Sequence, residues 1–290
     1  MRVLITGAGG QVGRELIRSA PSHAVVRHAN RDELDISDPG AVHQAVAEFS
    51  PTVILNAAAY TAVDRAEQEP AAALRVNAEG PRLLAQAALG LHGCRMVHIS
   101  TDYVFDGDRS RPYGTADTPH PLGVYGRSKL EGELAVRETL GLRAVIVRTS
   151  WLYGAHGRNF VHTMLRLMRE RGAVRVVADQ IGTPTAAHTF AEALWQFAQR
   201  PGLAGVFNWT DAGVSSWYDF AVAIAEEAGV LGLIPEAVDV SPIATEDYPT
   251  PARRPAYSVL DKRAAIAALG MEPRHWRVRL REVLKEIAHG

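Results

Sequence analysis

The chain has 290 residues, of which 47% are hydrophobic and 22% are charged, the balance of a folded globular protein. Its formal net charge of -1 argues against a general nucleic-acid-binding protein, and no apolar run reaches the roughly 18 residues of a membrane span. The single cysteine, Cys94, excludes an internal disulfide, and we expect the cytoplasm as the compartment.

The first 18 residues have the pattern of a strand, a glycine loop and a helix. Residues 3–5 are apolar, the loop 7–13 reads Gly-Ala-Gly-Gly-Gln-Val-Gly, and a helical pattern follows. Glycines permit a tight turn and a close approach of the backbone to a pyrophosphate, and the helix N-terminus adds free N–H groups. The pattern predicts a dinucleotide site rather than an ordinary strand–helix turn, with these candidates: Gly7, Gly10, Gln11 and Val12.

The second strand, residues 24–26, is followed by candidate contacts for the adenosine half of the dinucleotide. An acidic residue at the end of this strand would favour NAD. Here Arg31 is the first charged residue beyond the strand region, and it suits a 2′-phosphate, although a solvated loop charge is an equal alternative. Asp35 comes later and is placed to reach the adenine, as is the neighbouring Ile36.

Strands and helices alternate up to about residue 150. Helices are expected at 41–49, 63–67 and 71–89 and after Tyr125, and strands at 53–56, 96–101 and 144–148. This alternation is typical of an α/β fold with a doubly wound, Rossmann-like parallel sheet. Small residues after the third strand let a ligand lie flat on the backbone, and an Asn inside a predicted helix, where Asn is unfavourable, indicates a structural or ligand-linked role; the residues are Ala57, Ala58, Ala59, Tyr60 and Asn77.

The regular alternation of strands and helices ends in the second half of the chain. Helices are expected at 160–171, 189–199, 217–228 and 278–288, with a short strand at 174–177 and polar or proline-rich loops at 179–185 and 248–255. A strand near 206–209 is expected to rejoin the first sheet. We therefore expect a dinucleotide-binding domain at 1–150 and a smaller, irregular substrate-binding lobe at 151–290 that covers the carboxyl ends of the strands.

Three side chains are expected to converge at that edge. Tyr125 and Lys129 are four residues apart on a predicted helix, so they share one face, and the lysine is expected to lower the tyrosine pKa. Thr101 ends a neighbouring strand. In a carbonyl reduction, Thr101 would orient the substrate carbonyl, Tyr125 would donate a proton, and Lys129 would hold the nicotinamide ribose, with no metal. The alternative is a chance pair at an exposed helix start.

Taken together, these motifs resemble an extended short-chain dehydrogenase/reductase and, more narrowly, the dTDP-4-dehydrorhamnose reductase family. The similarity covers nearly the whole chain and rests on the segments 7–13, 56–67, 100–107, 148–153, 179–185 and 249–255 together with Tyr125 and Lys129. It implies NADPH-dependent reduction of the 4-keto group of dTDP-4-dehydro-6-deoxy-L-mannose to dTDP-L-rhamnose, with NADH as an alternative reductant.

The resemblance also implies contacts with the dTDP-sugar. The candidates are Thr101, Asp102, Phe105, Trp151, Asn159, Gln180 and Arg254. Asp102 is in addition a catalytic candidate, a core position is the alternative for Trp151, and Arg253 is an equal alternative to Arg254. Some family members hold Mg²⁺ between two subunits. Glu15 matches one such acidic position but His188 stands at another, so Mg²⁺ and a homodimer are allowed, and no metal is expected at the active site.

Two other readings stay open. The first is a sugar-nucleotide epimerase or dehydratase of the same superfamily. Related dehydratases carry two carboxylates after the threonine, whereas here Tyr103 follows Asp102, which favours net reduction. The second is a non-catalytic NADP-binding regulatory subunit, against which the intact Thr101, Tyr125 and Lys129 argue.

Overall fold

A computed structural model describes residues 1–235 and 237–290. Its centre is a six-stranded sheet in which every neighbouring pair of strands is parallel. In sheet order, the strands are β10 (Gly205–Asn208), β5 (Ala144–Thr149), β4 (Arg95–Thr101), β3 (Val53–Asn56), β1 (Arg2–Thr6) and β2 (Val25–Ala29). The predicted return of a late strand to this sheet is confirmed, because β10 pairs with β5.

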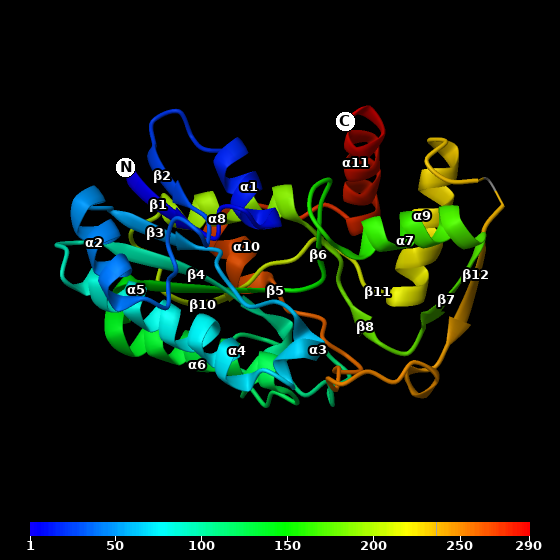
Figure 1. Ribbon diagram of the computed structural model, residues 1–290, viewed down its shortest axis with the longest axis horizontal. Helices are drawn as coiled ribbons and strands as arrows, with labels where there is room; N and C mark the ends of the chain where they lie inside the picture. Colours follow the sequence, from blue (N-terminus) through cyan, green and yellow to red (C-terminus); the bar gives the residue numbers. More distant parts are fainter. Residues whose placement is uncertain (236) are drawn as a thin grey trace.

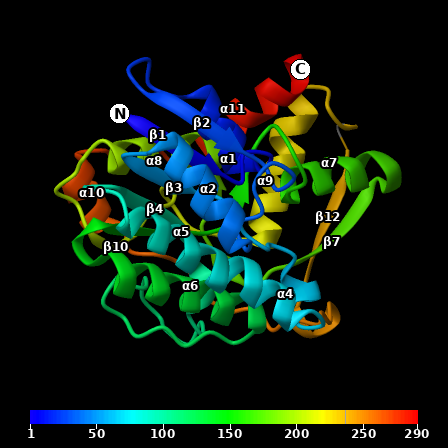
Figure 2. The same cartoon turned by 60° about the vertical axis from the view of Figure 1, so that its left-hand side comes forward.

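Helices cover both faces of the sheet (Figure 1). Alternate residues of β1 point to opposite faces, so Val3 and Ile5 pack in one core and Leu4 in the other. The first core lies under α1 (Gln11–Arg18), α8 (Ala187–Ala198) and α10 (Arg263–Leu269). The second lies under α2 (Pro39–Phe49), α5 (Gly80–Leu89) and α6 (Val124–Leu140), which lie side by side in Figure 2. This arrangement confirms the predicted doubly wound architecture.

The helical segment before α5 is not uniform. A short helix, α3 (Val63–Ala66), precedes α4 (Pro70–Leu74), and the five residues from Arg75 to Glu79 then form a π-helical turn that leads into α5. A π turn inserts one extra residue and is frequent at functional sites. The predicted single helix at 71–89 is therefore interrupted at Asn77.

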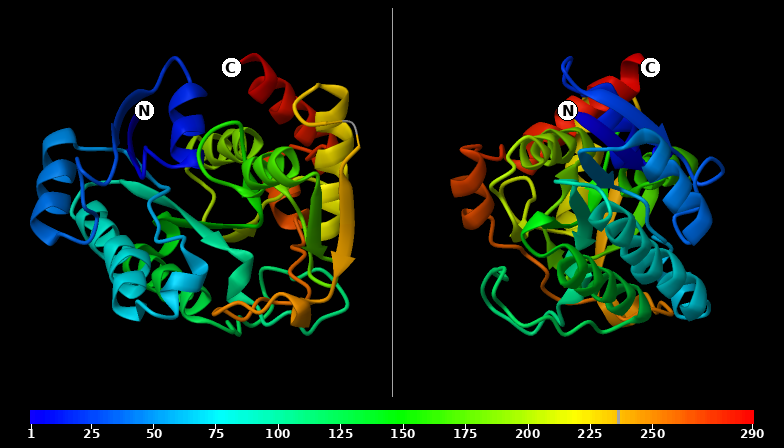
Figure 3. Two further views of the ribbon diagram at one scale, coloured as in Figure 1. Left: turned by 45° about the vertical axis from the view of Figure 1, so that its right-hand side comes forward. Right: turned by 90° about the vertical axis from the view of Figure 1, so that its left-hand side faces the viewer.

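The second lobe has its own core between three helices and a small sheet. These elements are α7 (Phe160–Arg171), α9 (Trp217–Val230), α11 (Trp276–His289), β7 (Ala173–Val177) and β12 (Asp239–Ile243). β12 was not predicted and pairs in parallel with β7, as Figure 3 shows. Two shorter strand pairs lie in the same half of the chain: β6 (Leu152–Tyr153) with β9 (Thr185–Ala186), and β8 (Ile181–Gly182) with β11 (Ser215–Ser216). Over the described residues, no helix is long and apolar enough to cross a membrane.

Candidate active site

The glycine loop forms a tight turn at the N-terminus of α1. Gly7 has φ +74°, and a Cβ at this position would lie 2.5 Å from the Ala58 nitrogen. A Cβ at Gly13 would lie 2.2 Å from the Gly7 carbonyl oxygen. Only glycine fits either position without a shift of the backbone. The loop therefore lies directly against the segment that follows β3 and leaves the first turn of α1 open to a ligand.

A cleft runs along this loop toward the end of β2. Its lining includes these predicted cofactor-binding residues: Gly7, Gly10, Arg31, Asp35, Ile36, Ala57, Ala58, Ala59 and Tyr60. Arg31 is exposed at the rim. The Asp35 carboxylate accepts hydrogen bonds from the Ser37 hydroxyl (2.6 Å) and amide (2.9 Å), and these bonds lower its pKa. A cationic guanidinium at the open rim suits a phosphate group.

Asn77 lies outside this cleft and is completely buried. Its side-chain oxygen accepts from the Tyr60 amide (2.8 Å), and its nitrogen donates to the Tyr60 carbonyl (3.0 Å) and to the Ser128 hydroxyl (3.0 Å). The expected direct contact with the cofactor is therefore replaced by an indirect role. Asn77, in the middle of the π turn, holds the cleft segment at Tyr60 against α6.

A second cleft adjoins the first and shares Gly10 and the three alanines with it. It is lined by the following predicted residues: Gln11, Val12, Thr101, Asp102, Tyr125, Lys129, Trp151 and Asn159. Thr101 ends β4 and Tyr125 lies in the first turn of α6. The structure thus brings the hydroxyl, the phenol and the ammonium to one cleft at the carboxyl edge of the sheet.

The Tyr125 phenol is more weakly acidic than the sequence predicted. Desolvation raises its pKa to about 12, the nearby Asp102 charge also raises the pKa, and a hydrogen bond with Thr101 lowers it. The predicted lowering by Lys129 is wrong, because the lysine Nζ donates to the main-chain carbonyl of Ile99 (2.6 Å). A shared helix face therefore did not mean a direct contact between the phenol and the ammonium.

Lys129 and Asp102 are both buried and both have perturbed pKa values. Burial lowers the pKa of Lys129 to about 8, although the Glu133 carboxylate raises it. Burial raises the pKa of Asp102 to about 6, against the effect of hydrogen bonds from Ser258 and Thr101. The Thr101 hydroxyl donates to the Asp102 carboxylate at 3.0 Å. Such shifts are typical of groups that act in proton transfer near neutral pH.

Trp151 is held in a strained position at the mouth of the second cleft. Its φ of +46° is unusual for a bulky residue. Its indole stacks on Trp217 with 3.5 Å between ring centroids and 5° between ring planes. At Gly182, a Cβ would come within 2.5 Å of the same indole. Trp217 also lines the cleft, which could not be predicted from its place at a helix start.

Three other predicted substrate contacts lie away from this cleft. Phe105 is fully buried and stacks on Tyr113 with 4.2 Å between ring centroids, so it is a core residue. The Gln180 amide donates to the Thr245 hydroxyl (3.1 Å). Arg254 forms an ion pair with Asp64 (2.9 Å). These two polar side chains already have protein partners: Thr245 in the second lobe for Gln180, and Asp64 on α3 for Arg254.

Arg254 lies near the cleft without lining it, whereas Asn159 is part of the lining. The Arg254 guanidinium lies close to the half-buried Tyr103 phenol, which lines the cleft. Asn159 caps α7 by accepting from the His162 amide (3.1 Å). Its side-chain nitrogen donates to the Gln11 side chain (2.9 Å). This bond fixes the end of the glycine loop against the second lobe.

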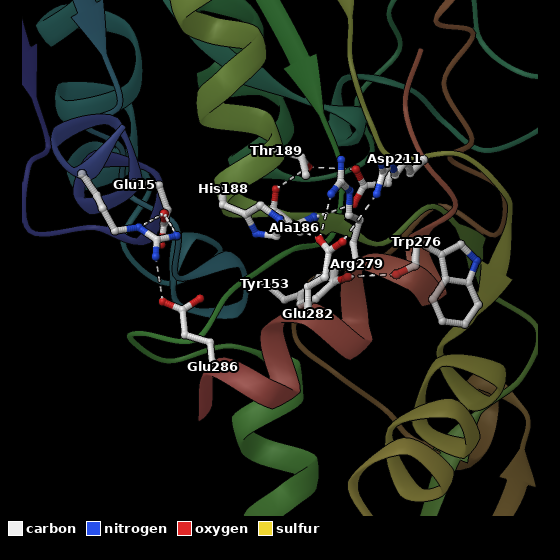
Figure 4. A network of polar contacts seen from close by, with 12 residues as sticks. Glu15, Tyr153, Ala186, His188, Thr189, Asp211, Trp276, Arg279, Glu282 and Glu286 are labelled. Carbon is white, nitrogen blue, oxygen red and sulfur yellow. Dashed lines mark hydrogen bonds and ion pairs between the residues drawn. The ribbon is translucent and has the colours of Figure 1, made fainter. Parts of the chain in front are cut away.

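The two positions considered for a metal have protein partners (Figure 4). The Glu15 carboxylate accepts from Arg18 (2.9 Å), and His188 Nε2 lies 3.3 Å from Glu282. Within residues 1–235 and 237–290, no group of three or more His, Cys, Asp or Glu side chains is arranged to hold a metal ion.

Comparisons with known proteins agree over the full length of the chain. A family model described as the RmlD substrate binding domain matches residues 1–289. dTDP-4-dehydrorhamnose reductases from Aggregatibacter actinomycetemcomitans and Burkholderia thailandensis are 44% and 46% identical, covering 97% and 96% of this chain and 98% and 96% of their own. A Bacillus anthracis dTDP-4-dehydrorhamnose reductase, solved in complex with NADP, is 38% identical with a TM-score of 0.91, covering 98% of this chain and 99% of its own. The chain therefore belongs to the RmlD substrate binding domain family.

Proposed function

We propose that this protein is an NADPH-dependent reductase that converts the 4-keto group of dTDP-4-dehydro-6-deoxy-L-mannose to the alcohol of dTDP-L-rhamnose. The observation that carries the proposal is the meeting of Thr101, Tyr125 and Lys129 in a cleft continuous with the glycine loop. The names of relatives that match over their full length support the substrate, and the NADP in a neighbouring structure supports the cofactor.

Each lobe would bind a different ligand. The first 150 residues, completed by β10, α8 and α10, would bind the dinucleotide, and the remainder of 151–290 would bind the nucleotide sugar. In this arrangement the sugar enters between Trp151 of the second lobe and the edge of the sheet. A homodimer and a cytoplasmic location stay predictions.

The first cleft fits a dinucleotide. The absence of side chains at Gly7 and Gly13 lets the loop approach a pyrophosphate closely, and the α1 N-terminus offers its N–H groups. Arg31 at the rim would contact the 2′-phosphate, and Lys129 would contact the nicotinamide ribose. When bound, NADPH supplies the hydride for the reduction.

Thr101 and Tyr125 would act on the ketone oxygen. The Thr101 hydroxyl would hydrogen-bond this oxygen and orient the carbonyl. With a pKa of about 12, the Tyr125 phenol is protonated at neutral pH, so the acid is present before the reaction begins. It would donate its proton as negative charge develops on the oxygen. The Lys129 ammonium, with a pKa of about 8, is mostly charged at neutral pH and would stabilise the resulting phenolate.

Asp102 would hold a sugar hydroxyl rather than carry out an elimination. Loss of water from a sugar requires one group to remove a proton and another to protonate the leaving hydroxyl. Asp102 can provide one of these functions, but the neighbouring Tyr103 is a phenol whose pKa is raised by burial, which makes it a poor base. This feature favours net reduction over the dehydratase alternative.

Two assays distinguish the reductase from the dehydratase and from the regulatory subunit. Supplied with NADPH and the keto sugar, the enzyme should oxidise NADPH, whereas a regulatory subunit would not. Supplied with NAD⁺ and dTDP-glucose, it should form no 4-keto-6-deoxy sugar. Formation of that sugar without net change in the cofactor would identify a dehydratase and overturn the proposal.

A further inference from the structure

A buried ion pair lies directly behind the proposed catalytic groups. The guanidinium of Arg148, on β5, donates from Nε to Oε1 of Glu133 (2.8 Å) and from Nη2 to Oε2 (2.6 Å), and Glu133 lies on α6. The side chains are 3% and 1% exposed. Apolar residues of similar volume often stabilise a fold as well as or better than such a pair. Fold stability alone therefore does not account for the two charges.

The pair joins α6, which carries Tyr125 and Lys129, to β5, the strand beside the one that ends at Thr101. Tyr125, Lys129 and Glu133 are spaced by four residues along α6 and share one face. In the sheet, Arg148 lies opposite Ser100, the residue before Thr101. The bidentate contact therefore fixes the position of the Lys129 helix relative to the strand end that presents Thr101.

Phe105 holds the arginine in this contact. The Arg148 guanidinium lies over the Phe105 ring, 5.1 Å from its centroid. A cation over an aromatic face is attracted by the ring electrons. The sequence predicted that Phe105 touches the sugar. In the structure Phe105 is instead buried in the core, where it restrains Arg148.

The charges around Lys129 indicate that Glu133 has a specific role. The elements packed against this part of α6 carry His98 on β4, Arg148 on β5 and Asp102 just after β4, and α6 itself carries Tyr125 and Glu133. His98 is completely buried, and burial together with the Lys129 charge keeps its pKa well below the ordinary value. Of these groups, Glu133 is the one whose charge favours the ammonium form of Lys129.

We propose that Glu133 is a positioning residue for the reduction: its carboxylate, clamped by Arg148, keeps Lys129 as an ammonium ion and fixes the helix face that carries both Lys129 and Tyr125. The inference rests on the proposed function, because the ammonium matters only if Tyr125 donates a proton. Glu133 itself is not expected to touch the substrate or the cofactor.

The test compares Glu133→Gln with Glu131→Gln, an exposed position on the same helix. Glu133→Gln should lower kcat about tenfold or more and move the alkaline limb of the rate profile to lower pH by about one unit or more, because an opposite charge near the ammonium is lost. NADPH affinity, measured by fluorescence, should stay within a few-fold. Glu133→Asp should restore part of the rate, and Glu131→Gln should match the wild type.

A double variant controls for folding. Glu133→Gln combined with Arg148→Met removes both charges together, so no unpaired charge stays buried. It should melt close to the wild type, with an alkaline limb still shifted but less than in Glu133→Gln, because the Arg148 cation that disfavours the ammonium is removed as well. An unshifted limb in the double variant, or a rate loss in Glu133→Gln that only follows its loss of thermal stability, would overturn the inference. Failure of the wild type to oxidise NADPH with the keto sugar would instead refute the proposed function.

Discussion

Replacing Tyr125 by phenylalanine should abolish turnover while leaving the fold and cofactor binding intact. The substitution removes one oxygen and keeps the ring, which packs edge-on against Tyr103 at 5.6 Å and against the small apolar cluster of Ala66, Ala73 and Val124. The core contacts of α6 are therefore retained. Gly7 and Arg31 line the first cleft, whereas Tyr125 lines the second, so NADPH affinity should be unchanged.

The expected loss follows from the proton that Tyr125 supplies. A positioned general acid typically contributes about a hundredfold or more, which corresponds to roughly 2.7 kcal/mol or more in the activation free energy. Among the described residues that line this cleft, Asp102 is the other candidate acid, but its carboxylate accepts a hydrogen bond from Thr101, and the Lys129 ammonium bonds the Ile99 carbonyl.

The assay is steady-state NADPH oxidation with the keto sugar, together with a fluorescence titration of NADPH and a thermal melt. Tyr218→Phe is a matched control, since Tyr218 lies on α9 and lines a groove on the second lobe. Activity of Tyr125→Phe within a few-fold of the wild type would refute the assignment of Tyr125 as the proton donor.

Four further predictions test other parts of the site. Arg31→Ala should raise the KM for NADPH by about ten- to a hundredfold, from the loss of roughly 1.5–3 kcal/mol, and change that for NADH little; equal effects would show that Arg31 does not contact the 2′-phosphate. The rate should fall as pH rises through about 8, where the Lys129 ammonium is lost, and a flat profile to pH 10 (about the reference pKa of lysine) would contradict this. Gly182→Ala should displace the Trp151 indole and raise the KM for the sugar with little change for NADPH, which parallel titrations would check. EDTA should leave the rate intact, and a loss that Mg²⁺ restores would show that a metal is needed.

The sequence predicted the parts of the fold that follow from local pattern. The glycine loop between a strand and a helix, the alternation of apolar strands with helices, and the return of residues 206–209 to the sheet all appear in the structure. Parallel strands end at one edge, so the meeting of Thr101 and Tyr125 in one cleft also followed from topology.

The remainder depends on tertiary partners that a sequence does not specify. The spacing of Tyr125 and Lys129 defined a helix face, but the long lysine side chain reaches a carbonyl on β4 instead of the phenol. Asn77 and Gln180 are polar residues whose partners come from distant segments, and only the structure identifies them. β12 pairs with a strand more than sixty residues earlier, and its mixed, exposed sequence carries no clear alternation.

The most direct test of net reduction follows the hydrogen that NADPH transfers to the sugar. NADPH carrying deuterium at its transferable position should be supplied with the keto sugar, and the product examined by mass spectrometry and NMR. Net reduction of the 4-keto group predicts one NADPH oxidised for each sugar reduced and one deuterium retained at C4 of the product. A product without deuterium, or conversion of the sugar with the label returned to the cofactor, would contradict net reduction by this enzyme.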